Sequence, residues 1–157
     1  MSMPDQEASR LSRDRSLLYG GLLTGAAALL HAGIILGGPD WYRFFGAGER
    51  MARLSARGSR YPILVTAGIA AILGIWALYA LSGAGVIRRL PLLRLVLVLI
   101  AAVYLIRGAA GIPVVLFVDD PYTNELKGRM TFMVVSSAIC VCLGLCYAVG
   151  ARKLSDE

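Results

Sequence analysis

Four long apolar runs dominate the chain, and shorter segments carrying charge, Pro or Gly separate them. The runs extend from Ser16 to Gly38, Pro62 to Val86, Leu95 to Val118 and Met130 to Ala151. A transmembrane helix needs about 20 mainly apolar residues, and every run reaches that length without the period-two alternation of a barrel strand. The pattern predicts an all-α protein, a four-transmembrane-helix bundle forming one integral membrane domain over 1–157. Its spans would cover about 16–38, 62–86, 92–118 and 130–151, between polar tails at 1–15 and 152–157.

Residues 40–60, between the first two runs, have a different pattern. Their arginines recur at helical spacing, at Arg43, Arg50, Arg53, Arg57 and Arg60. If Asp40 caps a helix, Trp41, Phe44 and Met51 fall on the opposite face. Helices with one basic and one aromatic face are typical of the membrane interface. We therefore expect an amphipathic interfacial helix over about 40–60, between the first and second spans.

The first run begins after three arginines and contains Ala26 and Ala28, small residues of the kind that a signal peptidase cuts after. Apolarity continues through Leu36, as a retained helix requires and a signal peptide does not. We expect the first helix to be uncleaved.

Composition agrees with a membrane protein. The 157 residues are 57% hydrophobic and 17% charged, with a mean hydropathy of +0.68, too apolar for one water-soluble core. The formal net charge is +6, but nearly all basic residues lie in tails and loops, where they set orientation and attract anionic lipid. Membrane lipids are therefore expected partners, and nucleic acid is not.

Four spans place both termini on one side of the membrane. That side carries 8 basic residues and the other carries 7, so the count alone hardly decides the orientation. The short second loop holds Arg88, Arg89 and Arg94 next to helix ends, which favours cytoplasmic termini. The arginines of 40–60 would prefer the anionic cytoplasmic leaflet and favour the opposite orientation. We expect both termini in the cytoplasm of a bacterial inner (plasma) membrane.

Small residues recur four positions apart in the first two runs. The pairs are Gly21 with Gly25, Gly33 with Gly37, and Ala70 with Gly74. Such pairs allow close helix packing. Packing within one bundle and association with a second copy or another membrane protein both fit this spacing.

Arg107 is the single charged residue inside the four runs. A guanidinium at membrane depth is costly, and it usually faces a bundle interior or wet cavity, or reaches the interface. It could anchor a carboxylate, a phosphate or a quinone-like oxygen, near a kink or unwound turn at Gly108 to Pro113. Alternatively, the helix ends near Gly108, and Arg107 pairs with Glu49, Asp119 or Asp120.

Helix rise, about 1.5 Å per residue, puts four polar side chains toward the membrane face of the first and third loops: His31, Thr66, Arg107 and Ser136. A pocket near this face is therefore predicted, with aromatic residues around it. The predicted ligand-binding residues are Arg107, His31, Ser136, Thr66, Trp41, Tyr42, Glu49 and Tyr104. The alternatives are a neutral imidazole bonded to a backbone carbonyl for His31 and an interfacial belt or core for the aromatic residues.

Several chemistries lack the residues they need. One histidine cannot supply the paired axial ligands of a b-type haem, and Cys140 points away from Cys142 and Cys146 on a helix, so no three-cysteine metal site forms. No phosphate-binding glycine loop and no spaced nucleophile, base and orienting residue occur. We expect no catalytic residue, no metal and no cofactor beyond a bound lipid or quinone.

In size, four-span layout and a semi-apolar segment after the first helix, the chain resembles DoxX-type bacterial membrane proteins. The likeness is one of topology and implies no residue roles. Our leading hypothesis is a non-enzymatic membrane protein that binds a lipid, quinone or other amphiphile. The alternatives are an accessory or oligomeric membrane subunit, which would bind a second copy or a membrane-protein partner, and a small oligomeric transporter or channel.

Overall fold

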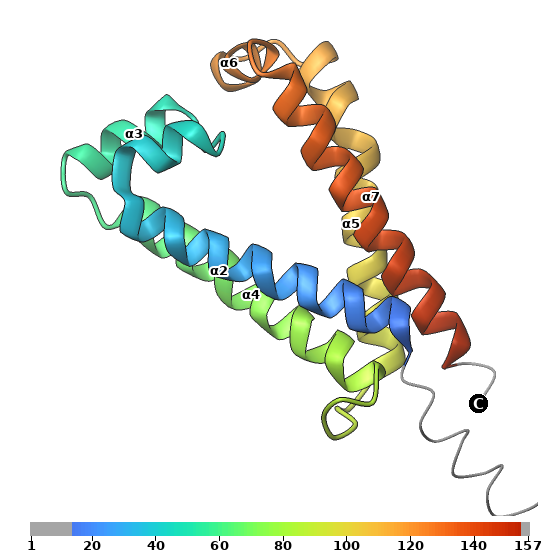
Figure 1. Cartoon of the computed structure of the whole chain (residues 1–157). Helices are drawn as coiled ribbons and strands as arrows, with labels where there is room; N and C mark the ends of the chain where they lie inside the picture. The colour runs from blue at the N-terminus through green and yellow to red at the C-terminus, as the bar shows by residue number, and fades with distance from the viewer. Residues whose placement is uncertain (1–13, 155–157) are drawn as a thin grey trace, which may run out of the picture.

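The computed structural model of the protein describes residues 14–154, which contain six helices and no strand (Figure 1). The helices are α2 (Arg15–Phe44), α3 (Glu49–Ala56), α4 (Tyr61–Gly83), α5 (Leu93–Phe117), α6 (Pro121–Lys127) and α7 (Met130–Lys153). Four of them, α2, α4, α5 and α7, are long and apolar enough to cross a membrane. The predicted helical class and the four candidate spans are thereby confirmed. Most of the predicted N-terminal tail, with Arg10 and Arg13, lies outside the described residues.

Side-chain caps set the beginnings of two helices. Asp14 accepts hydrogen bonds from the backbone N–H groups of Ser16 (2.8 Å) and Leu17 (3.3 Å) at the start of α2. Burial would raise the pKa of Asp14, but the hydrogen bonds from Ser16 and Leu17 outweigh it, so this pKa lies below its usual value. Asp120 caps α6 in the same way. Such caps satisfy backbone donors that the helix itself leaves unpaired.

The long helices form two hairpins. Helix α2 packs along α4, and α5 packs along α7. The hairpins meet where α2 and α5 begin and α4 and α7 end, and they diverge toward α3 and α6 (Figure 1). The main apolar core lies at this meeting point, with Leu17, Ala80, Leu97, Ile100 and Tyr147 among its buried residues.

Glycines allow the helices of each hairpin to approach closely. A Cβ on Gly144 would lie 2.7 Å from Cγ of Leu105, and one on Gly108 would lie 3.0 Å from the carbonyl oxygen of Ser137. Gly21 faces α4, where its Cβ would lie 3.1 Å from that of Ala80. Gly21 therefore serves packing within one bundle, the first of the two interpretations of the small-residue pairs.

The segment 40–60 differs from the single amphipathic helix that its arginine spacing predicts. Helix α2 continues past a kink at Gly38 (φ 67°), so Asp40 lies inside a helix and does not cap one. After Phe44, Gly46 (φ 75°) and Gly48 (φ 91°) form a turn, and α3 takes only residues 49–56. Glycine adopts positive φ at little cost, so these two positions interrupt a pattern that otherwise suits one helix.

Helix α5 does not have the early end or the unwound turn near Gly108 that were considered from the sequence. It runs from Leu93 to Phe117 with Pro113 inside it, and it neither ends near Gly108 nor unwinds there. Arg107 therefore lies well inside a candidate span.

Candidate functional site

Arg107 lies against Gly111, one helical turn further along α5. A Cβ on Gly111 would be 2.6 Å from Nη1 of Arg107 and 2.6 Å from Oγ of Ser137 on α7. Because Gly111 has no side chain, the guanidinium can lie close to the helix and near that hydroxyl. The Arg107 side chain is otherwise exposed.

The guanidinium of Arg107 forms no ion pair with any residue between 14 and 154. The carboxylates proposed from the sequence as its partners have other contacts. Glu49 pairs with Arg43 at 2.8 Å, Asp119 accepts a hydrogen bond from Asn124 at 2.8 Å, and Asp120 caps α6. The structure thus leaves the charge of Arg107 without a carboxylate in the part of the chain that it describes.

Ser137 contributes a second unsatisfied group. Its side chain is 4% exposed, and Oγ has no hydrogen-bond partner among the described residues. Buried hydroxyls usually have partners, so an unpaired one calls for an explanation. The predicted residue Ser136 instead donates to the carbonyl of Met133 at 3.1 Å. Adjacent helical residues point about 100° apart, and it is Ser137 that faces α5.

A set of polar contacts joins the hairpins at the end opposite the main core. We call it the interhairpin bridge, and it consists of Arg43 to Glu49 on one side and Tyr122, Glu125 and Arg129 on the other. Both carboxylate oxygens of Glu125 accept from the N–H of Glu49 at 3.0 Å. Tyr122 Oη donates to the carbonyl of Gly46 at 3.2 Å, and Arg129 donates to the carbonyls of Arg43 and Phe44.

The charges of this bridge match the helix ends that they contact. Glu125 is at the N-terminus of α3 and Arg129 at the C-terminus of α2, the signs that helix dipoles favour. Within the bridge, the hydrogen bond from Arg43 holds the pKa of Glu49 below its usual value. Burial raises the pKa of Tyr122, and the positive charge of Arg107 opposes that rise, so Arg107 lies within electrostatic reach of α6.

The other predicted residues have identifiable contacts. His31 Nδ1 lies 2.8 Å from the carbonyl oxygen of Ala27, so this side chain bonds to its own helix. Trp41 is 43% exposed and packs beside Phe45 with ring centroids 5.6 Å apart. Tyr42 is 1% exposed, and its hydroxyl has no partner among the described residues. Thr66 is 7% exposed on α4.

Tyr104 belongs to the core. Its hydroxyl lies 3.2 Å from Oγ1 of Thr24, and its ring packs against Trp76 and Tyr147. Tyr104 therefore has a structural role in the described residues, whereas Arg107 and Ser137 keep free hydrogen-bonding capacity.

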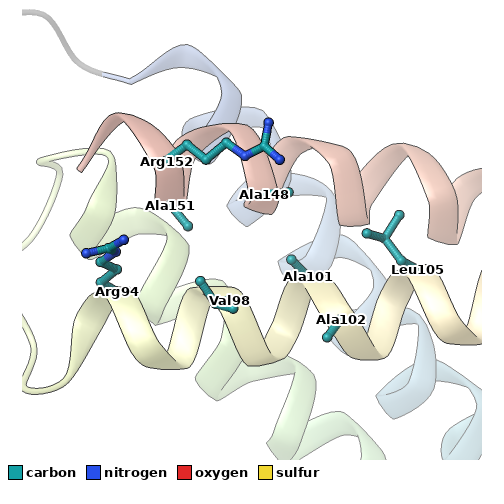
Figure 2. Close-up of a pocket in the computed structure, with 8 residues that line it drawn as sticks. All are labelled: Arg94, Val98, Ala101, Ala102, Leu105, Ala148, Ala151 and Arg152. Atoms are coloured by element: carbon teal, nitrogen blue, oxygen red, sulfur yellow. The ribbon is translucent and has the colours of Figure 1, made fainter. Parts of the chain in front are cut away.

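One groove in the structure has its charged rim where the hairpins meet, far from the loop face of the predicted pocket. It lies between α5 and α7, with Arg94 and Arg152 at that rim (Figure 2). A pocket beside the interhairpin bridge stays a prediction.

Within residues 14–154, no group of three or more His, Cys, Asp or Glu residues could hold a metal ion. What the side chains around Arg107 offer is hydrogen-bond donation to an anionic or carbonyl oxygen. Comparison with family models, with curated proteins and with solved structures found no match to this chain.

Proposed function

We propose that the protein binds a lipid, quinone or other amphiphile whose anionic or carbonyl oxygen contacts Arg107. The observation that carries this proposal is a guanidinium inside a candidate span with no ion pair among the described residues. An arginine at such depth costs several kcal/mol on insertion scales unless a partner or water compensates it. A ligand oxygen would supply that partner.

Ser137 and Gly111 support the same location. Nη1 of Arg107 and Oγ of Ser137 each lie 2.6 Å from where a Cβ on Gly111 would be, so one acceptor oxygen beside them could receive a hydrogen bond from each group. The hydrocarbon part would lie along exposed apolar side chains on the same face of α5, such as Val103 and Val114.

The proposal includes a placement in the membrane. Both termini would lie on the cytoplasmic side of a bacterial inner membrane. The second loop, which lies on the same side as the termini, is short and basic, and such loops tend to stay in the cytoplasm. Helix α3 would lie in the opposite interface. Its exposed Arg50 and Arg53 would face lipid phosphates, and its buried Ala52 and half-buried Met51 would face the bundle. This arrangement is typical of interfacial helices.

Arg107→Leu tests the anchor. Hydrogen bonds to a charged group contribute about 1.5–3 kcal/mol each. We therefore expect the variant to retain about one tenth of the wild-type amount of amphiphile, or less. The measurement is solvent extraction of the purified protein followed by quantitative mass spectrometry. Arg57→Leu, which removes an exposed arginine next to α3, is the control and should match the wild type. Equal amounts of every co-purified amphiphile in wild type and Arg107→Leu would refute the proposal.

A second candidate function is that of an accessory or oligomeric subunit, and the outer surface of α4 favours it. Gly68 and Gly74 have nothing within 4 Å of where a Cβ would be, and Ala67 and Ala71 are exposed beside them. Small residues on a lipid-facing helix surface are enriched where membrane helices associate. Cross-linking in native membranes distinguishes the two functions, since a stoichiometric protein product that Ala71→Leu abolishes would favour this one. A transporter or channel would also need several copies of the chain to associate, because four spans alone would not enclose a pathway.

A further inference from the structure

The groove between α5 and α7 combines an apolar floor with a basic rim (Figure 2). Its volume is about 530 Å³, within the usual range for small-molecule sites of roughly 300–1,000 Å³. The lining consists of Arg94, Val98, Ala101, Ala102, Leu105, Ala148, Ala151 and Arg152. The four alanines make the groove, because their short side chains leave space between two helices that larger residues would fill.

Charge and apolarity are arranged along the groove in the order of a phospholipid. Arg94 lies in the first turn of α5 and Arg152 in the last turn of α7, so the antiparallel helices bring both to one end. From Arg94 to Leu105 the groove follows α5 for about 16 Å, at 1.5 Å per residue. One leaflet of the hydrocarbon core is about 15 Å deep, half of the roughly 30 Å total. The groove therefore matches one acyl chain in one leaflet.

Both rim arginines are available to an anion. Neither Arg94 nor Arg152 forms an ion pair with another residue in the range 14–154, whereas the adjacent Lys153 lies 3.5 Å from Asp14. The first turn of a helix is also where a cation is least favoured by the helix dipole. The position of Arg94 thus has no local electrostatic explanation within α5.

We infer that this groove binds an anionic phospholipid, with its phosphate between Arg94 and Arg152 and one acyl chain over Ala101 and Ala148. Basic pockets between membrane helices are a known form of headgroup recognition. A zwitterionic lipid would bring its own cation close to the two guanidinium groups, so net negative charge should decide the selection. This site is separate from the one proposed at Arg107 and does not depend on it.

Native mass spectrometry of the full chain in detergent, with added phosphatidylglycerol or phosphatidylcholine of the same acyl chains, tests the charge. We expect wild type to retain phosphatidylglycerol preferentially. A rim arginine in direct contact with the lipid phosphate contributes the equivalent of about five-fold in affinity. Arg94→Gln and Arg152→Gln should therefore each weaken retention about five-fold, and the double variant about thirty-fold. Arg88→Gln, an exposed arginine in the loop at the same end, is the control and should leave retention unchanged.

Ala148→Leu tests the acyl-chain part, because it fills the groove and keeps both arginines. We expect retention of phosphatidylglycerol to fall, with soluble glycerophosphate competing poorly in the wild type. If Ala148→Leu does not fold, Ala102→Leu fills the same groove from its exposed side. Three results would each overturn the inference. The wild type could retain both lipids equally, or the arginine double variant could retain as much phosphatidylglycerol as the wild type. Glycerophosphate could also compete as strongly as the lipid does.

Discussion

Three hydroxyl groups form a polar centre within the apolar core. Tyr147 Oη lies 3.1 Å from Oγ1 of Thr24 and 3.2 Å from the carbonyl oxygen of Trp76, which accepts from it, and Tyr104 Oη lies 3.2 Å from the same Oγ1. Thr24 is fully buried. These contacts link all four long helices, and a membrane interior makes an unpaired hydroxyl costly.

Tyr147→Phe should therefore destabilise the protein. Removing this donor leaves Thr24 with one partner fewer and the Trp76 carbonyl without this contact, a loss of about 0.5–1.5 kcal/mol. Thermal unfolding in detergent would show it as a lower Tm. Tyr19→Phe changes an exposed tyrosine that lies on α2 and should not alter the Tm. Equal Tm values for the two variants would show that the hydroxyl network does not contribute to stability.

The ion pair between Arg43 and Glu49 gives the interhairpin bridge a dependence on pH. Because the hydrogen bond from Arg43 lowers the pKa of Glu49 in the folded protein, the pair stabilises the fold above the ordinary glutamate pKa, about 4.3. That contribution is lost as pH falls through the lowered folded value. We expect the Tm difference between wild type and Glu49→Gln to be present at about pH 6 and to vanish in strong acid. A difference independent of pH would contradict this assignment.

The sequence predicted Arg107 as the residue to examine because an isolated charge in an apolar run needs no structure to be noticed. It could not predict Ser137 in place of Ser136, since both are equally deep and only the packing of α5 on α7 shows which one faces inward. Tyr104 was predicted as a ligand residue. Its hydrogen-bond partner Thr24 lies 80 positions away in the sequence. The spacing of apolar residues does not show which distant residues come into contact.

Glycines on the long helices are of two kinds: some lie in close helix contacts and others face open space. A Gly→Ala substitution should change the stability in opposite directions at the two kinds of position. Gly144 and Gly108 lie between α5 and α7, where an added Cβ would come within 2.7 Å and 2.6 Å of neighbouring side-chain carbons and near backbone atoms. Gly68, on α4, has open space. Alanine favours a helix over glycine, but overpacking removes that advantage.

We expect Gly144→Ala to lower stability by about 1–3 kcal/mol and Gly68→Ala to raise it by about 0.5–1 kcal/mol. The opposite signs can be measured as Tm shifts in detergent on otherwise identical chains. A stabilising Gly144→Ala would mean that α5 and α7 are not in close contact at this position.

The four long helices were predictable because length and apolarity alone specify them. The segment 40–60 was not, because its arginine spacing fits a helix whichever backbone angles Gly46 and Gly48 adopt. A helical pattern reports which residues share a face only while the helix is continuous, and a positive φ at one glycine ends that continuity.

Two hairpins, connected at the core and again at the interhairpin bridge, make up the described chain (Figure 1). The sequence gives no indication of this arrangement, because helices that are apolar all around do not show which face contacts which neighbour. The bridge depends on Glu125 and Arg129 meeting a segment more than 70 positions earlier in the chain. Arg107 lies in the second half of α5, whereas Arg94 lies in its first turn and Arg152 in the last turn of α7.

Native mass spectrometry of wild type and Arg107→Leu, released side by side from membranes, tests the central proposal most directly, since it reports bound mass and subunit number together. We expect wild type to carry one small amphiphile per chain that is missing from Arg107→Leu, while phospholipid adducts that depend on Arg94 and Arg152 remain in both. Wild-type protein without any amphiphile, or the same adducts on both proteins, would contradict an anchoring role for Arg107.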